Sequence, residues 1–210
     1  MSFNKKYVAV VNYNAGNVRS VQKALEKFGA TAVITSNPSV IKEASALVFP
    51  GQGASDSSME QLKMNGLDHA IREFLNSGKP FLGVCLGLQL LLNGSDEGRE
   101  PGLGLIKGWV RELPDRVKIP HIGWNQVKFV SNHPVFKDVS SGSFFYFVHS
   151  YYADPENKQI VTGLTDYGLE FCSALCSENV VAVQFHPEKS GDLGLRIYKN
   201  FLGIVEDSVL

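Results

Sequence analysis

Short apolar runs alternate with segments of helical periodicity through the first half of the chain. Continuous runs rich in β-branched residues predict buried strands at residues 6–12, 31–36, 46–50 and 80–84. Apolar positions three and four apart predict helices at residues 17–28 and 67–76, and leucines at the same spacing predict another at 86–92. Because strands that are apolar throughout are buried on both faces, this order predicts a parallel sheet flanked by helices.

The pattern changes after Gly102. Apolar runs separated by Pro, Gly and Asn turns predict strands at residues 105–113, 121–130, 143–152, 159–164 and 180–185, followed by a last helix at 193–205. These strands should extend the same sheet with a more antiparallel part. The expected fold is therefore α/β, with a central mixed, mostly parallel sheet flanked by helices. No linker or repeat interrupts the pattern, so one domain over residues 1–210 is expected.

The charge balance and the length of the apolar runs argue against a nucleic-acid-binding protein and against a membrane protein. The 210 residues carry 20 Lys and Arg against 21 Asp and Glu, so no basic surplus points to nucleic acid. The longest apolar runs, such as GVCLGLQLLL, fall short of the roughly 20 residues that span a bilayer. The first residues, MSFNKKYVAVVNYN, lack the features of a signal peptide. We therefore expect a cytoplasmic protein without a membrane segment.

Three cysteines make an odd number, which excludes a simple disulfide framework and predicts reduced thiols. Cys172 and Cys176, in EFCSALCSE, resemble half of a zinc site, but no second pair of ligands has suitable spacing. They are expected to be packing residues in or beside a strand. No phosphate-binding loop or dinucleotide fingerprint is present either. No metal and no cofactor is expected.

The remaining cysteine, Cys85, lies in GKPFLGVCLGLQLL, where the predicted strand ends and a predicted helix begins. GVCLG fits a nucleophile elbow, in which Gly83 and Gly87 flank Cys85 on a sharp strand-to-helix turn. Side chains at the glycine positions would collide with the neighbouring strand and helix. The helix N-terminus would favour a thiolate there, at the sheet edge where ligands bind in α/β folds. The alternative is that Cys85 is a small apolar residue in a tight packing corner.

A cysteine nucleophile needs a base, and the base needs a group that orients it. The five candidate bases are His69, His121, His133, His149 and His186. The histidines in the amphipathic helix and in the turn SNHP are expected on the surface, and the one ending FFYFVH could be structural or line a pocket. In QFHPE, His186 ends a strand before a proline, and Glu188 lies two residues on, where it could hold the imidazole. A lone His-Pro-Glu is weak evidence, but it complements the elbow.

The motifs PGQGA, GVCLGLQ and QFHPEKS, in this order, resemble the class I, or triad, glutamine amidotransferases. The similarity runs from Tyr7 to about Phe201. It implies a flavodoxin-like α/β fold and a Cys-His-Glu triad that hydrolyses the side-chain amide of glutamine. By this resemblance, Cys85 attacks the amide carbon, His186 carries the proton to the leaving ammonia, and Glu188 orients His186.

The resemblance also implies an oxyanion hole and a glutamine site. Backbone N–H groups of Leu86 and of Gln52 or Gly53 would stabilise the tetrahedral oxyanion, although PGQGA alone could be a simple glycine turn. Similar relatives usually carry valine at Gln52, a change that a backbone donor tolerates. The implied glutamine-binding residues are Gly51, Gln89, Glu97, Ser150 and Tyr151. Of these, Glu97 would pair with the substrate ammonium, although SDEGRE alone is an ordinary solvated loop.

The stretch IPHIGWNQV indicates which amidotransferase this chain resembles. It is similar to the Pro-His-x-Gly-Trp-Asn signature of the glutaminase subunits of imidazole glycerol phosphate synthases, and NAGN at 14–17 and YFVHSYY also fit. This resemblance implies a heterodimer in which the glutaminase channels ammonia to a (β/α)₈ cyclase subunit in histidine biosynthesis. The implied interface residues are Asn17, His121, Trp124, Asn125, Tyr146 and Lys189. Alternatively, Trp124 fills the core and Asn125 caps a turn.

Other functions remain open on the sequence alone. A paralogous subunit could supply ammonia for surface-polysaccharide sugar synthesis with the same triad. A stand-alone cysteine hydrolase could share the scaffold, although the glutamine-site residues and IPHIGWN argue against it. A catalytically silent binding subunit is disfavoured by the intact set of Cys85, His186 and Glu188.

Overall fold

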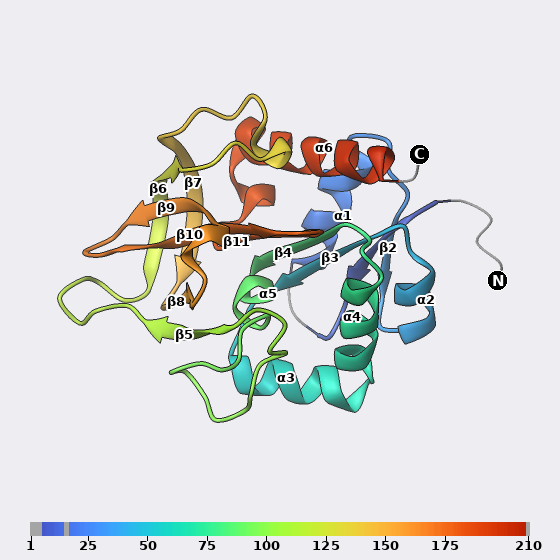
Figure 1. Cartoon of the computed structure of the whole chain (residues 1–210), viewed down its shortest axis with the longest axis horizontal. Coiled ribbons are helices and arrows are strands. Elements are labelled where there is room, and N and C mark those ends of the chain that lie inside the picture. Colours follow the sequence, from blue (N-terminus) through green and yellow to red (C-terminus); the bar gives the residue numbers. More distant parts are fainter. Residues whose placement is uncertain (1–5, 15–16, 209–210) are drawn as a thin grey trace.

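The computed structural model describes residues 6–14 and 17–208, so residues 15 and 16 of the NAGN block lie outside the described residues. Figure 1 shows a central sheet with helices on both faces. The first half of the chain forms β1 (Val8–Val11), α1 (Val18–Glu26), β2 (Ala32–Thr35), α2 (Pro38–Glu43), β3 (Ala46–Gly51), α3 (Ser55–Met64), α4 (Leu67–Asn76), β4 (Phe81–Cys85) and α5 (Leu86–Gln89).

The second half contributes most of the antiparallel strands and the longest helix. Its elements are β5 (Gly108–Glu112), β6 (His121–Phe129), β7 (Ser143–His149), β8 (Tyr151–Pro155), β9 (Val161–Asp166), β10 (Glu170–Ser177), β11 (Val180–Val183) and α6 (Gly191–Asp207). Single turns of 3-10 helix lie at Pro134–Phe136, Lys158–Ile160 and Pro187–Lys189.

The strands follow the order β2-β1-β3-β4-β11-β10-β9-β6-β7, with β8 pairing β10 and β5 pairing β8. The strands β2, β1, β3, β4 and β11 pair in parallel, and from β10 onward the pairing is antiparallel. The parallel strands are buried along almost their whole length because helices cover both faces. The expected α/β fold with a mixed central sheet is confirmed.

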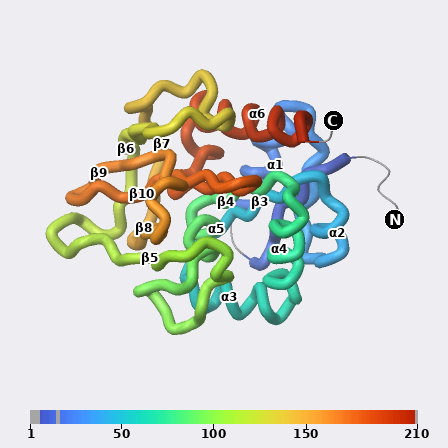
Figure 2. The backbone as a smooth tube through the Cα atoms, viewed as in Figure 1, coloured from blue at the N-terminus to red at the C-terminus, as the bar shows by residue number. Residues whose placement is uncertain are grey.

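Two apolar clusters hold the layers together. One face of the sheet packs against α1 and α6, through residues such as Leu25, Ile197 and Phe201. The other face packs against α2, α3, α4 and α5, through residues such as Leu62 and Phe74. The chain trace in Figure 2 shows the same two layers, with β6 to β9 gathered beyond the helices at one end of the molecule. In the described parts of the chain, no helix is both long enough and apolar enough to cross a membrane.

The structure departs from the expected elements in several places. The predicted strand at 143–152 is two strands, β7 and β8, and only Leu86–Gln89 of the predicted helix at 86–92 is helical. The helices α2 and α3 and the strand β10 were not predicted. Both Cys172 and Cys176 lie in β10, as expected for packing residues of a strand. These two cysteines and Cys85 are all free thiols.

Candidate active site

Cys85 occupies a strained turn between β4 and α5. Its φ of 55° and ψ of −111° lie in a region that residues with a side chain rarely adopt. The flanking glycines permit this turn, because a Cβ on Gly87 would lie 1.8 Å from the Phe49 carbonyl oxygen. A Cβ on Gly83 would come within 3.2 Å of Ala182 Cβ. The strand-to-helix elbow predicted from GVCLG is present, and its glycines are required for close packing.

The sheet order brings the histidine motif to the cysteine. Strand β4 pairs with β3 on one side and with β11 on the other, so the segments that follow these three strands meet at one edge of the sheet. Gly51 is the register partner of Cys85, and Val84 is that of Val183. His186 comes three residues after β11 ends, and therefore lies beside the elbow although it is about a hundred positions away in the sequence.

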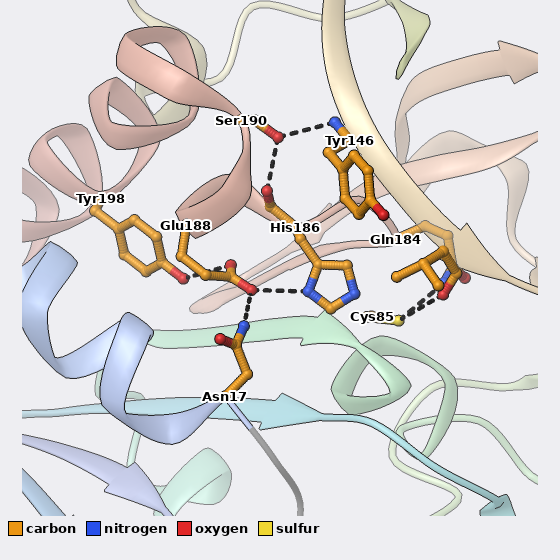
Figure 3. A network of polar contacts seen from close by, with 9 residues as sticks. Asn17, Cys85, Tyr146, Gln184, His186, Glu188, Ser190 and Tyr198 are labelled. Carbon is orange, nitrogen blue, oxygen red and sulfur yellow. Dashed lines mark hydrogen bonds and ion pairs between the residues drawn. The ribbon is translucent and has the colours of Figure 1, made fainter. Parts of the chain in front are cut away.

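A buried carboxylate holds the imidazole of His186. The Nδ1–H of His186 donates to Glu188 Oε1 at 2.8 Å, and the Glu188 side chain is only 1% exposed. Two further donors reach this carboxylate: Asn17 Nδ2 hydrogen-bonds to Oε1, and the hydroxyl of Tyr198 donates to Oε2 at 3.2 Å. Figure 3 shows the imidazole of His186 between Glu188 and the sulfur of Cys85. The carboxylate therefore fixes which ring nitrogen faces the thiol.

The ring nitrogen that faces Cys85 is unusual. Nε2 of His186 is buried and has no hydrogen-bond partner among the described residues. Burial alone would lower the pKa of His186, but interaction with Cys85 and then with Glu188 raises it from 6.5 to about 10. The imidazolium is therefore the favoured form of His186. A protonated base beside the sulfur is what a cysteine nucleophile requires.

The expected substrate residues surround a cavity of about 350 Å³ over Cys85. The cavity is lined by Gln52, Gly53, Cys85, Leu86, Gln89, Glu97, Pro120, Val148, His149, Ser150, Tyr151 and Lys189. Gly51, the register partner of Cys85, does not line the cavity, and a Cβ there would lie 2.3 Å from the Tyr13 hydroxyl. The structure thus brings together the residues that sequence motifs placed at an oxyanion hole and a glutamine site.

The polar groups of the cavity differ in how they are held. Glu97 Oε2 accepts a 2.9 Å hydrogen bond from the N–H of Ser55 at the start of α3. Burial raises the pKa of Glu97, and the Ser55 bond opposes that rise. Both amide hydrogens of Gln89 are already used, by Tyr151 O at 2.8 Å and Gln184 Oε1 at 3.0 Å. Gln89 therefore presents only its carbonyl oxygen to a ligand.

Comparison with known proteins identifies the family. The family model for glutamine amidotransferase class-I matches residues 9–204. The chain belongs to this family. It is 47% identical over 195 residues to imidazole glycerol phosphate synthase subunit HisH of Moorella thermoacetica, covering 92% of this chain and 93% of the relative. It is 46% identical over 202 residues to the subunit HisH of Syntrophotalea carbinolica, covering 92% and 98%.

Solved structures agree on the fold of this class I amidotransferase. The structure of PurLQS from Thermotoga maritima superposes with a TM-score of 0.75 at 18% identity, covering 95% of this chain and 99% of the other. A crystal structure of a glutamine amidotransferase gives a TM-score of 0.72 at 19% identity, covering 94% and 98%. At this identity the likeness concerns the fold alone.

Sequence reasoning missed several polar residues around the amidotransferase triad motif. Gln184 is fully buried, and its Nε2 lies 3.6 Å from Cys85 Sγ. Its signal was a lone polar residue inside the apolar run VVAVQF. Tyr198 and Asn17 reach Glu188 from α6 and from the start of α1, and neither contact has a local sequence signal. Asn17 was expected only at a partner interface.

The exposed face of β6 and β7 carries two of the interface residues expected for this amidotransferase, Trp124 and Tyr146, which are register partners. Trp124 is 55% exposed and therefore does not fill the core, and its ring meets that of Tyr146 edge to face. The Nζ of Lys189 lies 5.8 Å from the centre of the Tyr146 ring. His121, by contrast, is only 3% exposed and stacks on Phe147. Its side chain lies behind this face instead of on it.

Proposed function

We propose that this chain is the glutaminase subunit of an imidazole glycerol phosphate synthase in histidine biosynthesis. It would hydrolyse glutamine to glutamate and ammonia in the cytoplasm and pass the ammonia to a separate cyclase subunit. The observation that carries the chemistry is the buried Glu188–His186 pair facing Cys85 on a strained elbow. Identity of 44–47% with HisH subunits over about nine tenths of the chain supports the pathway.

In the first step, the Cys85 thiolate forms a bond to the side-chain amide carbon of glutamine. The carbonyl π electrons move to oxygen, and the tetrahedral oxyanion lies near the backbone N–H groups of Leu86 and of Gln52 or Gly53. Removing one such donor typically slows acyl transfer by ~10²–10³. The imidazolium of His186 gives its proton to the amide nitrogen, the carbon–nitrogen bond breaks, and ammonia leaves a thioester behind.

In the second step, neutral His186 takes a proton from water while the water oxygen attacks the thioester carbon. The carbon–sulfur bond then breaks, which regenerates the Cys85 thiolate and releases glutamate. Glu188 keeps the imidazole oriented in both steps, because its carboxylate accepts from Nδ1 and leaves Nε2 toward the reacting atoms. Holding the base in this way requires no metal or cofactor.

The substrate's α-amino acid end would be held at the far side of the cavity. Glu97 is the negative group that lines it, and it suits the α-ammonium. The carbonyl oxygen of Gln89 and the backbone at Ser150 and Tyr151 would complete the binding site for the polar end. The positively charged Lys189 at the same cavity would lie near the entrance or the partner.

The partner would be a (β/α)₈ cyclase chain, forming a heterodimer and receiving ammonia through the barrel. It would combine the ammonia with a phosphoribulosyl aminoimidazole carboxamide ribonucleotide, releasing imidazole glycerol phosphate and an aminoimidazole carboxamide ribonucleotide. The docking face would be centred on Trp124, Tyr146 and Lys189, with Asn17 at its edge. Asn125 would contribute from the opposite side of β6, where its Nδ2 donates to Asp166 O at 2.9 Å. An exposed Trp beside a Tyr is typical of interface anchors. His121 would act on the partner only through Asn125, whose Nδ2 lies 3.3 Å from its Nε2.

The decisive experiment measures glutamate release by the purified chain, alone and with a cyclase subunit and its nucleotide ligand. We expect weak release alone and an increase of orders of magnitude in the complex. Cys85→Ala should abolish release, whereas Cys176→Ala, a matched change at a distant thiol, should not. Release that the cyclase leaves unchanged would assign the chain to another pathway, such as surface-polysaccharide sugar synthesis. Peptide turnover without glutaminase activity would indicate a stand-alone hydrolase.

The docking face can be tested separately. Lys189→Ala should weaken the complex and its stimulation of glutamate release, because Lys189 is exposed and follows the triad glutamate. Lys199→Ala, at another exposed lysine, on α6, is the matched control and should leave both unchanged. Wild-type affinity and stimulation in Lys189→Ala would remove this residue from the interface.

A further inference from the structure

One buried amide beside Cys85 has no role in the mechanism above. Gln184 follows β11 directly, and its side chain is fully buried. Its Nε2 lies 3.6 Å from Cys85 Sγ, and its Oε1 accepts a 3.0 Å hydrogen bond from Gln89. Figure 3 shows Gln184 and His186 approaching the sulfur from different directions. The sulfur therefore has polar neighbours besides His186: the Gln184 amide, and the Val148 carbonyl oxygen at 4.0 Å.

The direction of the Gln184 amide follows from a backbone group. The carbonyl oxygen of Tyr151 can only accept hydrogen bonds, so the neighbouring Gln89 atom must be its amide nitrogen. The second hydrogen of that nitrogen points to Gln184, which must therefore present its oxygen there. The Gln184 nitrogen is left facing Cys85. The carbonyl of Tyr151 thus fixes the orientation of the Gln89 amide, which in turn fixes the orientation of the Gln184 amide beside Cys85.

This arrangement is costly if Gln184 serves only to fill space. An amide buried without full hydrogen bonding costs free energy, and an N–H that faces a neutral thiol gains little in return. A leucine or methionine would fill the same volume at the end of an apolar strand without that cost. The cost is offset when the sulfur is negatively charged, because a hydrogen bond to a charged group is stronger.

We propose that Gln184 is a positioning residue that directs an N–H at the Cys85 sulfur, holding it in place and stabilising its negative charge. Gln89 is the group that orients the Gln184 amide. The proposal deepens the proposed function and rests on Cys85 being its nucleophile. It assigns to Gln89 a second role besides substrate binding, since its amide hydrogens bond to Tyr151 O and Gln184 Oε1 and only its oxygen is left for a ligand.

The test measures the rate of Cys85 alkylation by iodoacetamide as a function of pH. Gln184→Met, which is similar in length but has no N–H, should move the midpoint of this profile up by about one pH unit. Below the midpoint, alkylation should be about tenfold slower. Gln184→Glu, which replaces the donor by a carboxylate, should move the midpoint further in the same direction. A residue with a merely structural role would leave the midpoint unchanged.

Two comparisons make the result specific. Gln159→Met, at an exposed glutamine, is the matched control and should keep the wild-type midpoint. Gln89→Met should shift the midpoint in the same direction but by less, because the Gln184 amide is then free to rotate. The other thiols contribute little, because burial raises the pKa of Cys172 and Cys176 to about 12. Their residual reaction is subtracted with Cys85→Ala.

The alkylation profile does not depend on which substrate the protein uses, so it can fail or succeed independently of the glutaminase assay. If glutamate is released, Gln184→Met should lower kcat about tenfold with little change in KM, because other residues line the cavity. An unchanged midpoint in folded Gln184→Met and Gln184→Glu would overturn the proposal. A wild-type chain without glutamate release but with a shifted midpoint in the variants would overturn only the proposed function.

Discussion

The buried histidines His121 and His149 should make the protein lose stability as the pH falls from 7 to 5. Nδ1 of His149 lies 2.9 Å from Tyr151 O, and His149 Nε2 lies 2.9 Å from His121 Nδ1. Because the carbonyl only accepts, His149 donates to it and accepts from His121, and both rings are neutral. Protonating His149 would place two N–H groups against each other.

The magnitude follows from the pKa values. Burial lowers the pKa of His149 from 6.5 to about 3 and that of His121 to about 4. Since both folded values lie below the unfolded value, the unfolded chain takes up protons first as the pH falls below 6.5. At pH 5 the loss is about 2 kcal/mol for each histidine, or about 4 kcal/mol if they act independently. His186 has the opposite sign: its raised pKa adds stability that is complete below pH 6.5 and lost toward pH 10.

Urea unfolding at pH 7 and pH 5 measures this loss. The double variant His121→Asn, His149→Asn should lose about 2–4 kcal/mol less than the wild type between the two pH values, whatever its stability at pH 7. Burial also lowers the pKa of His133. Because this histidine is present in both proteins, its contribution to the loss of stability cancels in the comparison. His69→Gln, at an exposed histidine, is the control. Equal losses in the double variant and the wild type would refute the argument.

Three further substitutions test the elbow, the triad carboxylate and the core by urea unfolding. Gly87→Ala should cost about 3 kcal/mol or more, because its Cβ would lie 1.8 Å from the Phe49 backbone oxygen; a variant as stable as wild type would show that the elbow can relax. Asn17→Ala removes a donor to the buried Glu188 carboxylate and should cost about 1.5–3 kcal/mol, and an unchanged unfolding midpoint would mean that this bond contributes nothing. Phe201→Ala empties a buried site between α6 and the sheet and should cost about 3–5 kcal/mol; a loss below about 1 kcal/mol would contradict its core position.

The parallel half of the fold could be predicted because its strands are continuous apolar runs and helices such as α1 and α4, which lie between them, have a clear helical period. The helix α3 could not, because SDSSMEQLKM is mostly polar and buries only a narrow stripe that includes Met59 and Leu62. Strand β10 was missed for a different reason: it is buried from Phe171 to Leu175, but the Cys and Ser residues in EFCSALCS do not form a clearly apolar run. Local pattern therefore predicts an element only when its buried positions carry clearly apolar side chains.

The site divides in the same way. Cys85, His186 and Glu188 could be named from sequence because each lies in a short motif whose chemistry depends on neighbouring residues. Asn17 could not, because its partner Glu188 is 171 positions away and only the sheet order brings them together. The motif IPHIGWN likewise does not show which of its side chains are buried: His121 is buried, whereas Trp124 is exposed. Alternation along β6 explains this difference only once the strand's outer face is known.

A single backbone carbonyl explains two of the features that sequence could not supply. Tyr151 O accepts from His149 and from Gln89, and because it cannot donate, it sets the direction of every hydrogen bond that leads to it. One chain leaves His121 and His149 neutral, which produces the acid sensitivity predicted above. The other leaves an N–H facing Cys85. Because the oxygen belongs to the main chain, a substitution at position 151 that leaves the backbone conformation unchanged should preserve both series of hydrogen bonds.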